Sequence, residues 1–357
     1  MKTSNPPQAF GAGLIALDLI LGADPEGPVK SWTGGTCGNV LSILAFLGWK
    51  SYPIARMNGD AASERVLTDM QRWGVQLDFA KCEPQGDTPI IVQQIKPDRN
   101  GNPSHRFLWA CPSCGKHLPR FKAVTQAAIE VVSPHMSGAS VFFMDRLSRA
   151  MLTMAKDASD SGAVVVFEPS AKSDPKHFAE AIKIAHVLKY ADQRLADAGD
   201  VISNETSVIL EIQTLGEQGL RYRSKSGNRP LPWKQMNAFK TPRLEDTCGS
   251  GDWCTAGLIN KLASGGLEVF DNHGPDEFAD ALTYGQSLAA WNCGFEGARG
   301  GMYSMSFEEF EQQVTDILNG EVYTAPNKPI LKEVEEIVSC PACASQPATV
   351  LGMENHL

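Results

Sequence analysis

Apolar residues occur along the chain in two kinds of run, which differ in length and spacing. The shorter runs are typical of buried strands, and they are Ala9–Leu21, Val141–Met144, Ala163–Phe167, His186–Lys189 and Val208–Thr214. The longer stretches carry apolar residues at helical spacing, and they are Gly38–Leu47, Ala61–Trp73, Leu147–Ser161 and Asp276–Trp291. Because such strands and helices alternate, we expect an α/β fold in which helices cover both faces of a mostly parallel sheet.

One segment interrupts this alternation. Ile90–Ile95 and His105–Trp109 flank the turn-rich Lys96–Ser104, and this arrangement predicts a β hairpin. Open α/β sheets bind ligands at the carboxyl ends of their strands, and a hairpin excursion is often a lid over such a site. We therefore expect a small β lid near residues 84–110.

Composition narrows the classes of function. The 357-residue chain is 43% hydrophobic, carries a net charge of −9 and has a pI of about 5.3. It has no Lys/Arg-rich run, so nucleic acid and anionic membranes are poor partners. Nothing resembles a secretory leader or a span of about 20 apolar residues, so we expect a cytoplasmic protein. A P-loop enzyme is excluded, because Gly115-Lys116 is followed by His117 rather than Ser or Thr.

The segment Asp246–Asp252, which reads Asp-Thr-Cys-Gly-Ser-Gly-Asp, carries the strongest chemical signal. Its glycines let backbone N–H groups approach a ligand, and the helix expected to follow adds unpaired donors at its N-terminus. Such a loop binds a phosphoryl group, and Asp252 beside it is able to accept a proton from an attacking hydroxyl. Taken alone, the segment also fits an ordinary capped helix start, with Asp246 or Thr247 as the cap.

Three earlier segments complete an ordered set with Asp246–Asp252. Gly13–Asp18 resembles a first strand that ends in a substrate-binding aspartate. Gly34–Asn39 contains two adjacent glycines and ends in asparagine, and Thr214–Gly219 contains a Thr-Leu-Gly turn. The set resembles the ribokinase-type (PfkB) carbohydrate and nucleoside kinase family over roughly residues 9–310.

The resemblance implies a three-layer ribokinase-like α/β fold, with a mostly parallel central sheet and a small β lid. It also implies ATP-dependent phosphorylation of a primary hydroxyl of a sugar, sugar acid or nucleoside. Asp252 would be the general base, and Gly249, Ser250 and Gly251 would form the anion hole for the transferred group. The residues implied to bind substrate are Asp18, Gly34, Gly35 and Asn39, and those implied on the nucleotide side are Thr214, Gly216, Gly219 and Asn292.

Cofactors, partners and domain limits follow from the same resemblance. ATP and Mg²⁺ are the implied cofactors, and Gly297–Gly301 resembles a turn that binds a monovalent cation in the family. The kinase domain would span residues 1–325, and residues 326–357 would form a C-terminal tail. An exposed lid hairpin is able to pair with another, which predicts a homodimer through the lid.

The chain departs from the family pattern at the metal. Relatives carry Asn-x-x-Glu, which organises the water shell of the metal, whereas Ala191 and Arg194 stand at those two positions here. Asp192 is the nearby carboxylate that could substitute in part, and Glu168 stands where the family often has aspartate. These changes leave a second interpretation open: a catalytically impaired family member that acts as a small-molecule-binding regulatory protein.

The nine cysteines are an odd number in a chain too large to need disulfides. Two matched pairs, Cys111 with Cys114 and Cys340 with Cys343, each have two residues between the thiols, a spacing that fits a tetrahedral zinc site. Such a site would pin the tail to the segment that follows the lid. Reduced thiols in two separate turns are the alternative, and the sequence leaves both open.

Overall fold

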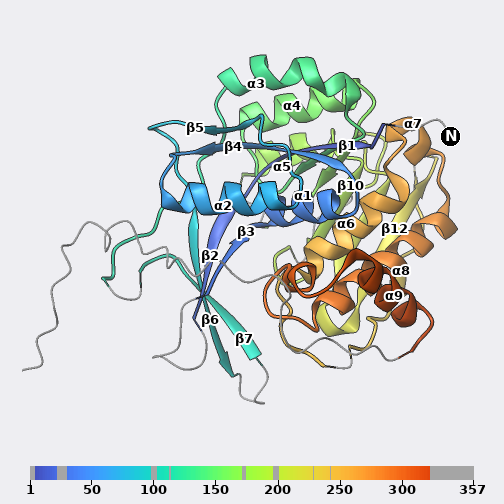
Figure 1. Cartoon of the computed structure of the whole chain (residues 1–357). Coiled ribbons are helices and arrows are strands. Elements are labelled where there is room, and N and C mark those ends of the chain that lie inside the picture. Colours follow the sequence, from blue (N-terminus) through green and yellow to red (C-terminus); the bar gives the residue numbers. More distant parts are fainter. Residues whose placement is uncertain are drawn as a thin grey trace, which may run out of the picture.

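The computed structural model describes residues 5–21, 30–97, 103–111, 114–170, 174–195, 201–227, 229–241 and 243–321. These residues form a main sheet and a smaller second sheet (Figure 1). In the main sheet the strands lie in the order β13-β12-β11-β10-β9-β8-β1-β4-β5, with β14 paired to β12. The strands from β11 to β5 in this order pair in parallel, and β12 turns back antiparallel at one side.

The strands of the main sheet are β1 (Gln8–Ala12), β4 (Lys50–Met57), β5 (Ala80–Cys82), β8 (Val141–Met144), β9 (Val164–Phe167), β10 (Val187–Ala191), β11 (Leu210–Thr214), β12 (Leu220–Ser226), β13 (Arg229–Pro230) and β14 (Lys234–Met236). The short apolar runs from Val141 to Thr214 match β8, β9, β10 and β11 of the main sheet closely, whereas β4, β5, β12, β13 and β14 lie outside the predicted runs. Strands β8 and β9, in the middle of the sheet, are apolar at every position because both of their faces are covered. In β8, Val141 and Phe143 pack into one core cluster while Phe142 and Met144 pack into the other.

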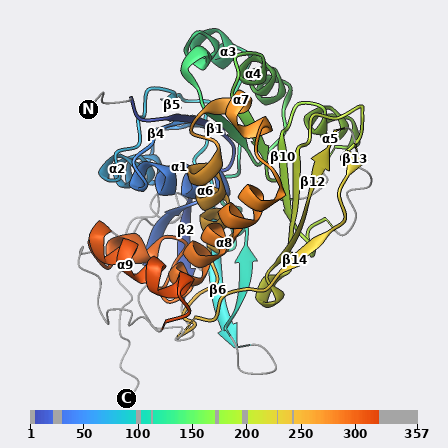
Figure 2. The ribbon, with the colours of Figure 1, turned by 90° about the vertical axis from the view of Figure 1, so that its right-hand side faces the viewer.

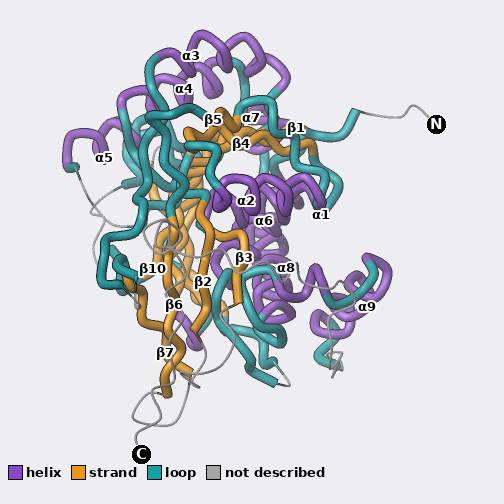
Figure 3. The backbone as a smooth tube through the Cα atoms, turned by 60° about the vertical axis from the view of Figure 1, so that its left-hand side comes forward, coloured by secondary structure: helices purple, strands orange, loops and turns teal. Residues whose placement is uncertain are grey.

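Helices lie on both sides of the main sheet (Figure 3). They are α1 (Thr36–Phe46), α2 (Ala61–Arg72), α3 (Ala127–Val132), α4 (Arg149–Asp160), α5 (Pro175–Ile182), α6 (Ser250–Leu262), α7 (Gly266–Asp271), α8 (Pro275–Asn292) and α9 (Phe307–Leu318), with short 3₁₀ helices η1 (Ser133–Gly138), η2 (Gly216–Gln218) and η3 (Gly300–Tyr303). Buried side chains of α1, α6 and α8 form one cluster with the sheet, and those of α4 and α5 form the other. The expected three-layer arrangement is therefore confirmed.

The smaller sheet consists of β3 (Lys30–Gly34), β2 (Ala16–Leu21), β6 (Ile90–Pro97) and β7 (Pro103–Leu108), in that order. It extends from one end of the main body (Figures 1 and 2). Strands β6 and β7 pair antiparallel, so the hairpin prediction is confirmed. The sequence pattern did not predict that β2 and β3 join the β6–β7 hairpin in one sheet.

The prediction of one continuous strand over Ala9–Leu21 is wrong. The run divides into β1 in the main sheet and β2 in the smaller sheet. The division falls where the backbone N–H of Leu14 donates a hydrogen bond to Asp145 Oδ1, at 2.8 Å. Gly13 permits this approach, because a Cβ atom there would lie 1.7 Å from the same oxygen. The apolar pattern does not reveal that the chain passes from one sheet to the other, because nearly all residues of both strands are buried.

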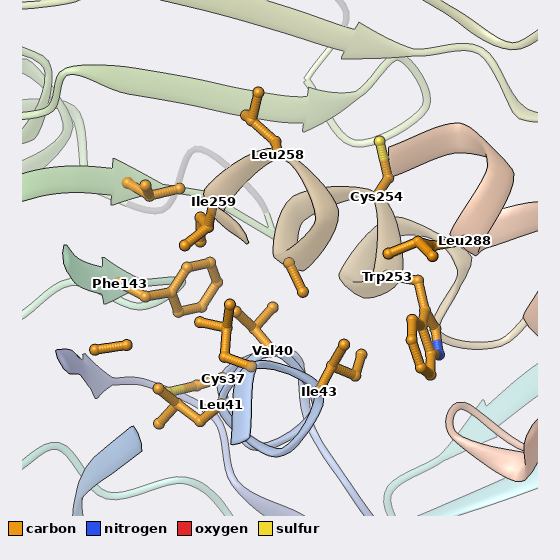
Figure 4. Close-up of a cluster of buried hydrophobic side chains, with 14 of the residues drawn as sticks. Cys37, Val40, Leu41, Ile43, Phe143, Trp253, Cys254, Leu258, Ile259 and Leu288 are labelled. Atoms are coloured by element: carbon orange, nitrogen blue, oxygen red, sulfur yellow. The ribbon is translucent and has the colours of Figure 1, made fainter. Parts of the chain in front are cut away.

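Helix α1, which begins within the Gly34–Asn39 motif, packs against α6, which begins within the Asp246–Asp252 motif. Val40 of α1 lies opposite Ile259 of α6, and Phe143 of β8 lies alongside (Figure 4). Trp253, in the first turn of α6, is fully buried and donates its indole N–H to the Ala298 carbonyl at 3.0 Å. The start of α6 is therefore fixed from several sides.

No helix in the described ranges is long and apolar enough to span a membrane.

Candidate active site

The glycine-rich segment forms the start of α6, as its sequence predicts. Gly249 is the N-cap with φ of 75°, a left-handed conformation that other residues rarely adopt. A Cβ atom at Gly249 would also lie 2.3 Å from the Ala298 carbonyl oxygen, so glycine is required twice over. Ser250, Gly251 and Asp252 form the first turn, whose N–H groups have no partner within the helix. This is the geometry of an anion-binding loop.

Asp252 is buried at this site and is held by a residue from a distant motif. Asn39 Nδ2 donates a hydrogen bond to Asp252 Oδ2 at 2.7 Å, across 213 residues of sequence. Burial and the neighbouring Glu168 raise the pKa of Asp252 to about 7, against the opposing effects of the Asn39 hydrogen bond and of Lys189. A carboxyl group with a pKa near neutrality is well matched to accept a proton from a hydroxyl.

The substrate-side residues predicted from sequence also come together. Asp18 lies within β2 rather than at a strand end, and its Oδ2 accepts a hydrogen bond from Gln93 Nε2 at 3.0 Å. Gly34 lies directly against this carboxylate, because a Cβ atom there would lie 2.0 Å from Asp18 Oδ2. Gly35, with φ of 81°, is the N-cap of α1 and leads the chain to Asn39.

Two buried oxygens in this group have no hydrogen-bond partner among the described residues: Asp18 Oδ1 and Asn39 Oδ1. A buried acceptor without a partner is costly, so each is suited to receive a hydrogen bond from a ligand. Burial also raises the pKa of Asp18 to about 7, opposed by the Gln93 hydrogen bond and by Arg299. The pair fits a ligand rich in hydroxyl donors.

Gln93 is a residue of the site that sequence reasoning missed. It lies on β6, is 2% exposed, and also accepts from Cys248 Sγ through its Oε1 at 3.7 Å. It therefore connects Asp18 to the residue that precedes the anion-binding loop. Two adjacent glutamines inside an apolar run are an available signal, but strand periodicity alone does not say which of them faces the site.

The nucleotide-side motif lies at the carboxyl end of β11. Thr214 is the last residue of β11 and pairs in register with Ala191, the last residue of β10. Gly216 and Gly219 have φ of 61° and 87° and form the tight turn into β12. Asn292, at the end of α8, donates hydrogen bonds to the carbonyls of Cys248 and Gly297, each at 3.3 Å, and so supports the glycine-rich segment before α6.

Comparison with known proteins decides the family. Residues 26–304 match the model of the pfkB family of carbohydrate kinases. The chain belongs to this family. It is therefore an ATP-dependent carbohydrate kinase by family, and the prediction made from the ordered motifs is confirmed.

Relatives and solved structures agree with this assignment. An ATP-dependent ribose-1-phosphate kinase of Halopiger xanaduensis is 22% identical over 80% of this chain and 89% of its own. A fructokinase of Klebsiella pneumoniae is 24% identical over 83% of this chain and 95% of its own. The structure of a Xylella fastidiosa fructokinase with bound ATP superposes with a TM-score of 0.66 at 14% identity, covering 87% of this chain and 98% of that one. The protein thus has the ribokinase-like fold.

The segment where the sequence predicts the metal-organising residues lies at the carboxyl end of β10. Ala191 presents only a methyl group, and Asp192 Oδ1 accepts from the neighbouring Gln193 N–H at 2.7 Å. Among the described residues, no group of three or more His, Cys, Asp or Glu side chains is placed to hold a metal ion. The described residues at this position therefore do not fit a Mg²⁺ ion held by the protein itself.

The proposed zinc and monovalent-cation sites stay predictions. Cys111 is buried and begins a tight turn closed by the Gly115 N–H bond to its carbonyl at 2.8 Å, with Cys114 inside the turn. Cys340 and Cys343 lie outside the described residues. In the turn Gly297–Gly301, the guanidinium of Arg299 is buried and pairs with Asp69 at 2.7 Å.

Proposed function

We propose that the protein transfers the γ-phosphoryl group of ATP to a primary hydroxyl of a sugar, sugar acid or nucleoside, with Asp252 as general base. The observation that supports this most strongly is the hydrogen bond from Asn39 to Asp252. It joins a motif expected to bind substrate to the carboxylate beside the anion-binding loop. A substrate hydroxyl bound by the Gly34–Asn39 motif would therefore lie next to Asp252, the proposed base.

The proposed reaction is an in-line displacement. The substrate hydroxyl oxygen forms a bond to the γ-phosphorus, and the bond from that phosphorus to the bridging oxygen of ADP breaks. The hydroxyl proton passes to Asp252. The N–H groups of Gly249, Ser250 and Gly251 stabilise the charge on the transferred group, because they are fixed in place before the reaction. Mg²⁺ bound to ATP as part of the nucleotide substrate would screen the charge of its phosphates.

Substrate and nucleotide bind on opposite sides of this loop in the proposal. The acceptor would be bound by Asp18, Gly34, Gly35 and Asn39. Its hydroxyl groups would donate hydrogen bonds to Asp18 Oδ1 and Asn39 Oδ1. Thr214, Gly216 and Gly219 would contact the nucleotide, with Asn292 supporting the loop between the two ligands. The names of the relatives suggest the acceptors to try first: ribose 1-phosphate, fructose and, from a Burkholderia thailandensis nucleoside kinase solved with inosine, nucleosides.

The smaller sheet is the proposed surface of a homodimer. Phe107, at 47% exposure, and Trp109, at 50%, are large hydrophobic side chains on and just after β7. Strand β7 ends the smaller sheet on one side, and an open strand edge is a ready surface for pairing with a second copy.

A second function is a regulatory protein that binds a small molecule without phosphorylating it. The replacement of the family's metal-organising residues by Ala191 and Arg194 favours it. Measurement of ADP release over a panel of sugars, sugar acids and nucleosides, with and without Mg²⁺, separates the two. ADP release that depends on one acceptor supports the kinase, whereas tight binding of an acceptor with no ADP release supports the regulatory protein.

A further inference from the structure

A buried ion pair lies beneath the first turn of α6. Lys189 Nζ of β10 is 2.5 Å from Glu168 Oε1, and the side chains are 2% and 14% exposed. The other oxygen of Glu168 accepts a hydrogen bond from Thr255 Oγ1, which lies one turn into α6, at 2.6 Å. The pair therefore connects β10 and the carboxyl end of β9 to the helix that carries Asp252.

The ammonium group lies directly behind the anion-binding loop. A Cβ atom at Gly251 would lie 3.4 Å from Lys189 Nζ and 3.7 Å from Glu168 Oε1. Burial opposes the charge of Lys189, but the carboxylate of Glu168 outweighs it, and the pKa of Lys189 is raised. A positive charge therefore lies close to the first turn of α6, the turn that is proposed to stabilise the transferred phosphoryl group.

Charged groups approach Asp252 from three neighbouring strands of the main sheet. Asp145 follows β8, Glu168 follows β9, and Lys189 lies on β10. From α1, Asn39 is neutral, and burial raises the pKa of Cys37 so far that its thiol stays uncharged. Two carboxylates that disfavour ionisation of Asp252 are thus opposed by the ammonium group of Lys189.

We propose that Lys189, held in place by Glu168, is a positioning residue for phosphoryl transfer: it keeps the Asp252 carboxyl ionisable and fixes the turn that forms the anion hole. This inference rests on the proposed role of Asp252 as base. Lys189 acts through Asp252 and the loop, without contact to the reacting atoms. Neither its charge nor its place behind the loop is apparent from the family motifs in the sequence.

The test is the pH dependence of kcat for the wild type, for Lys189→Met, and for the double variant Lys189→Met/Glu168→Gln. Lys189→Met leaves Glu168 without its counter-charge, so the acid limb of the profile moves up by about one pH unit or more. The double variant removes both charges, so its acid limb returns toward that of the wild type. Arg223→Met is the matched control, because Arg223 and Glu211 form another ion pair on neighbouring strands, 13% and 1% exposed.

A kcat lowered equally at every pH in Lys189→Met, with no movement of the acid limb, would overturn the inference and leave Lys189 a structural residue. Carboxyl titration by NMR of protein labelled with ¹³C-aspartate, with the Asp252 signal assigned from Asp252→Asn, gives a readout that does not require turnover. A shifted Asp252 titration in a protein that releases no ADP would support the role of Lys189 while contradicting the proposed function. An unshifted titration overturns the inference in either case.

Discussion

At the scale of single residues, the site depends on side chains that are buried and only partly hydrogen-bonded. Gln93 is the clearest case, because one amide group serves both Asp18 and Cys248. Its Nε2 donates to one oxygen of Asp18, while the other oxygen has no hydrogen-bond partner among the described residues. Gln93 thereby sets the orientation of a carboxylate that is expected to bind substrate.

Replacing Gln93 by methionine should raise KM for the acceptor more than it lowers kcat. The change leaves a buried carboxylate oxygen without its donor, at a cost of about 1–3 kcal/mol, or about 5- to 150-fold. Gln94→Met is the matched control, because Gln94 lies next to Gln93 on β6 and points to the other face of the strand. Steady-state kinetics check the result, and equal effects of the two changes would contradict it.

At the scale of elements, the turn into α6 needs glycine for two separate reasons. Gly249 has a positive φ and also lies against the Ala298 carbonyl. Gly320 has a nearly equal φ of 76°, but a Cβ atom there would meet nothing within 4 Å. The two positions therefore separate the cost of the backbone conformation from the cost of the close contact.

Gly249→Ala should destabilise the protein more than Gly320→Ala does. We expect Gly320→Ala to cost about 1–2 kcal/mol, the usual penalty of the left-handed conformation. At Gly249 the clash with Ala298 adds about 1–3 kcal/mol, as overpacking does elsewhere, and distorts the anion-binding loop. Urea unfolding measures both costs, and ADP release should be lost only in Gly249→Ala. Equal losses of unfolding free energy in the two variants would contradict a contribution of the Ala298 contact to the cost at Gly249.

Several central elements could be predicted from the sequence, since β8, β9, β11, α2 and α4 fall close to where the pattern puts them. Apolar periodicity reports burial, and burial alone cannot show that β1 and β2 enter different sheets. The order of the motifs predicted that Asp252 and Asn39 belong to one site. The roles of Gln93, Asp145 and Lys189 could not be predicted, because each depends on a contact between residues far apart in the chain.

At the scale of the whole molecule, the buried carboxyl groups link stability to pH. Burial raises the pKa of Asp18 and Asp252 to about 7 and that of Asp145 to about 6, all from 3.8. The folded protein therefore binds these protons more tightly than the unfolded chain does. Their contribution to stability is present below about pH 4 and is lost as the pH rises through about 6 to 7.

The neutral variant Asp18→Asn should gain stability relative to the wild type as the pH rises from 5 to 8. The amide carries no charge at any of these pH values, so it avoids the cost of a buried carboxylate. Thermal unfolding at both pH values checks this, with Asp160→Asn as a control because Asp160 is exposed on α4. The same difference in melting temperature at pH 5 and pH 8 would contradict the raised pKa of Asp18.

The most direct test of the account is the Asp252→Asn variant, which keeps the shape of the side chain and removes the base. Single-turnover transfer of the γ-phosphoryl group should fall by about 10²–10⁴-fold, the usual contribution of a general base. Binding of ATP and of the acceptor, measured by calorimetry, should stay within a few-fold of the wild type. Transfer at the wild-type rate in Asp252→Asn would contradict the assignment of Asp252 as the base.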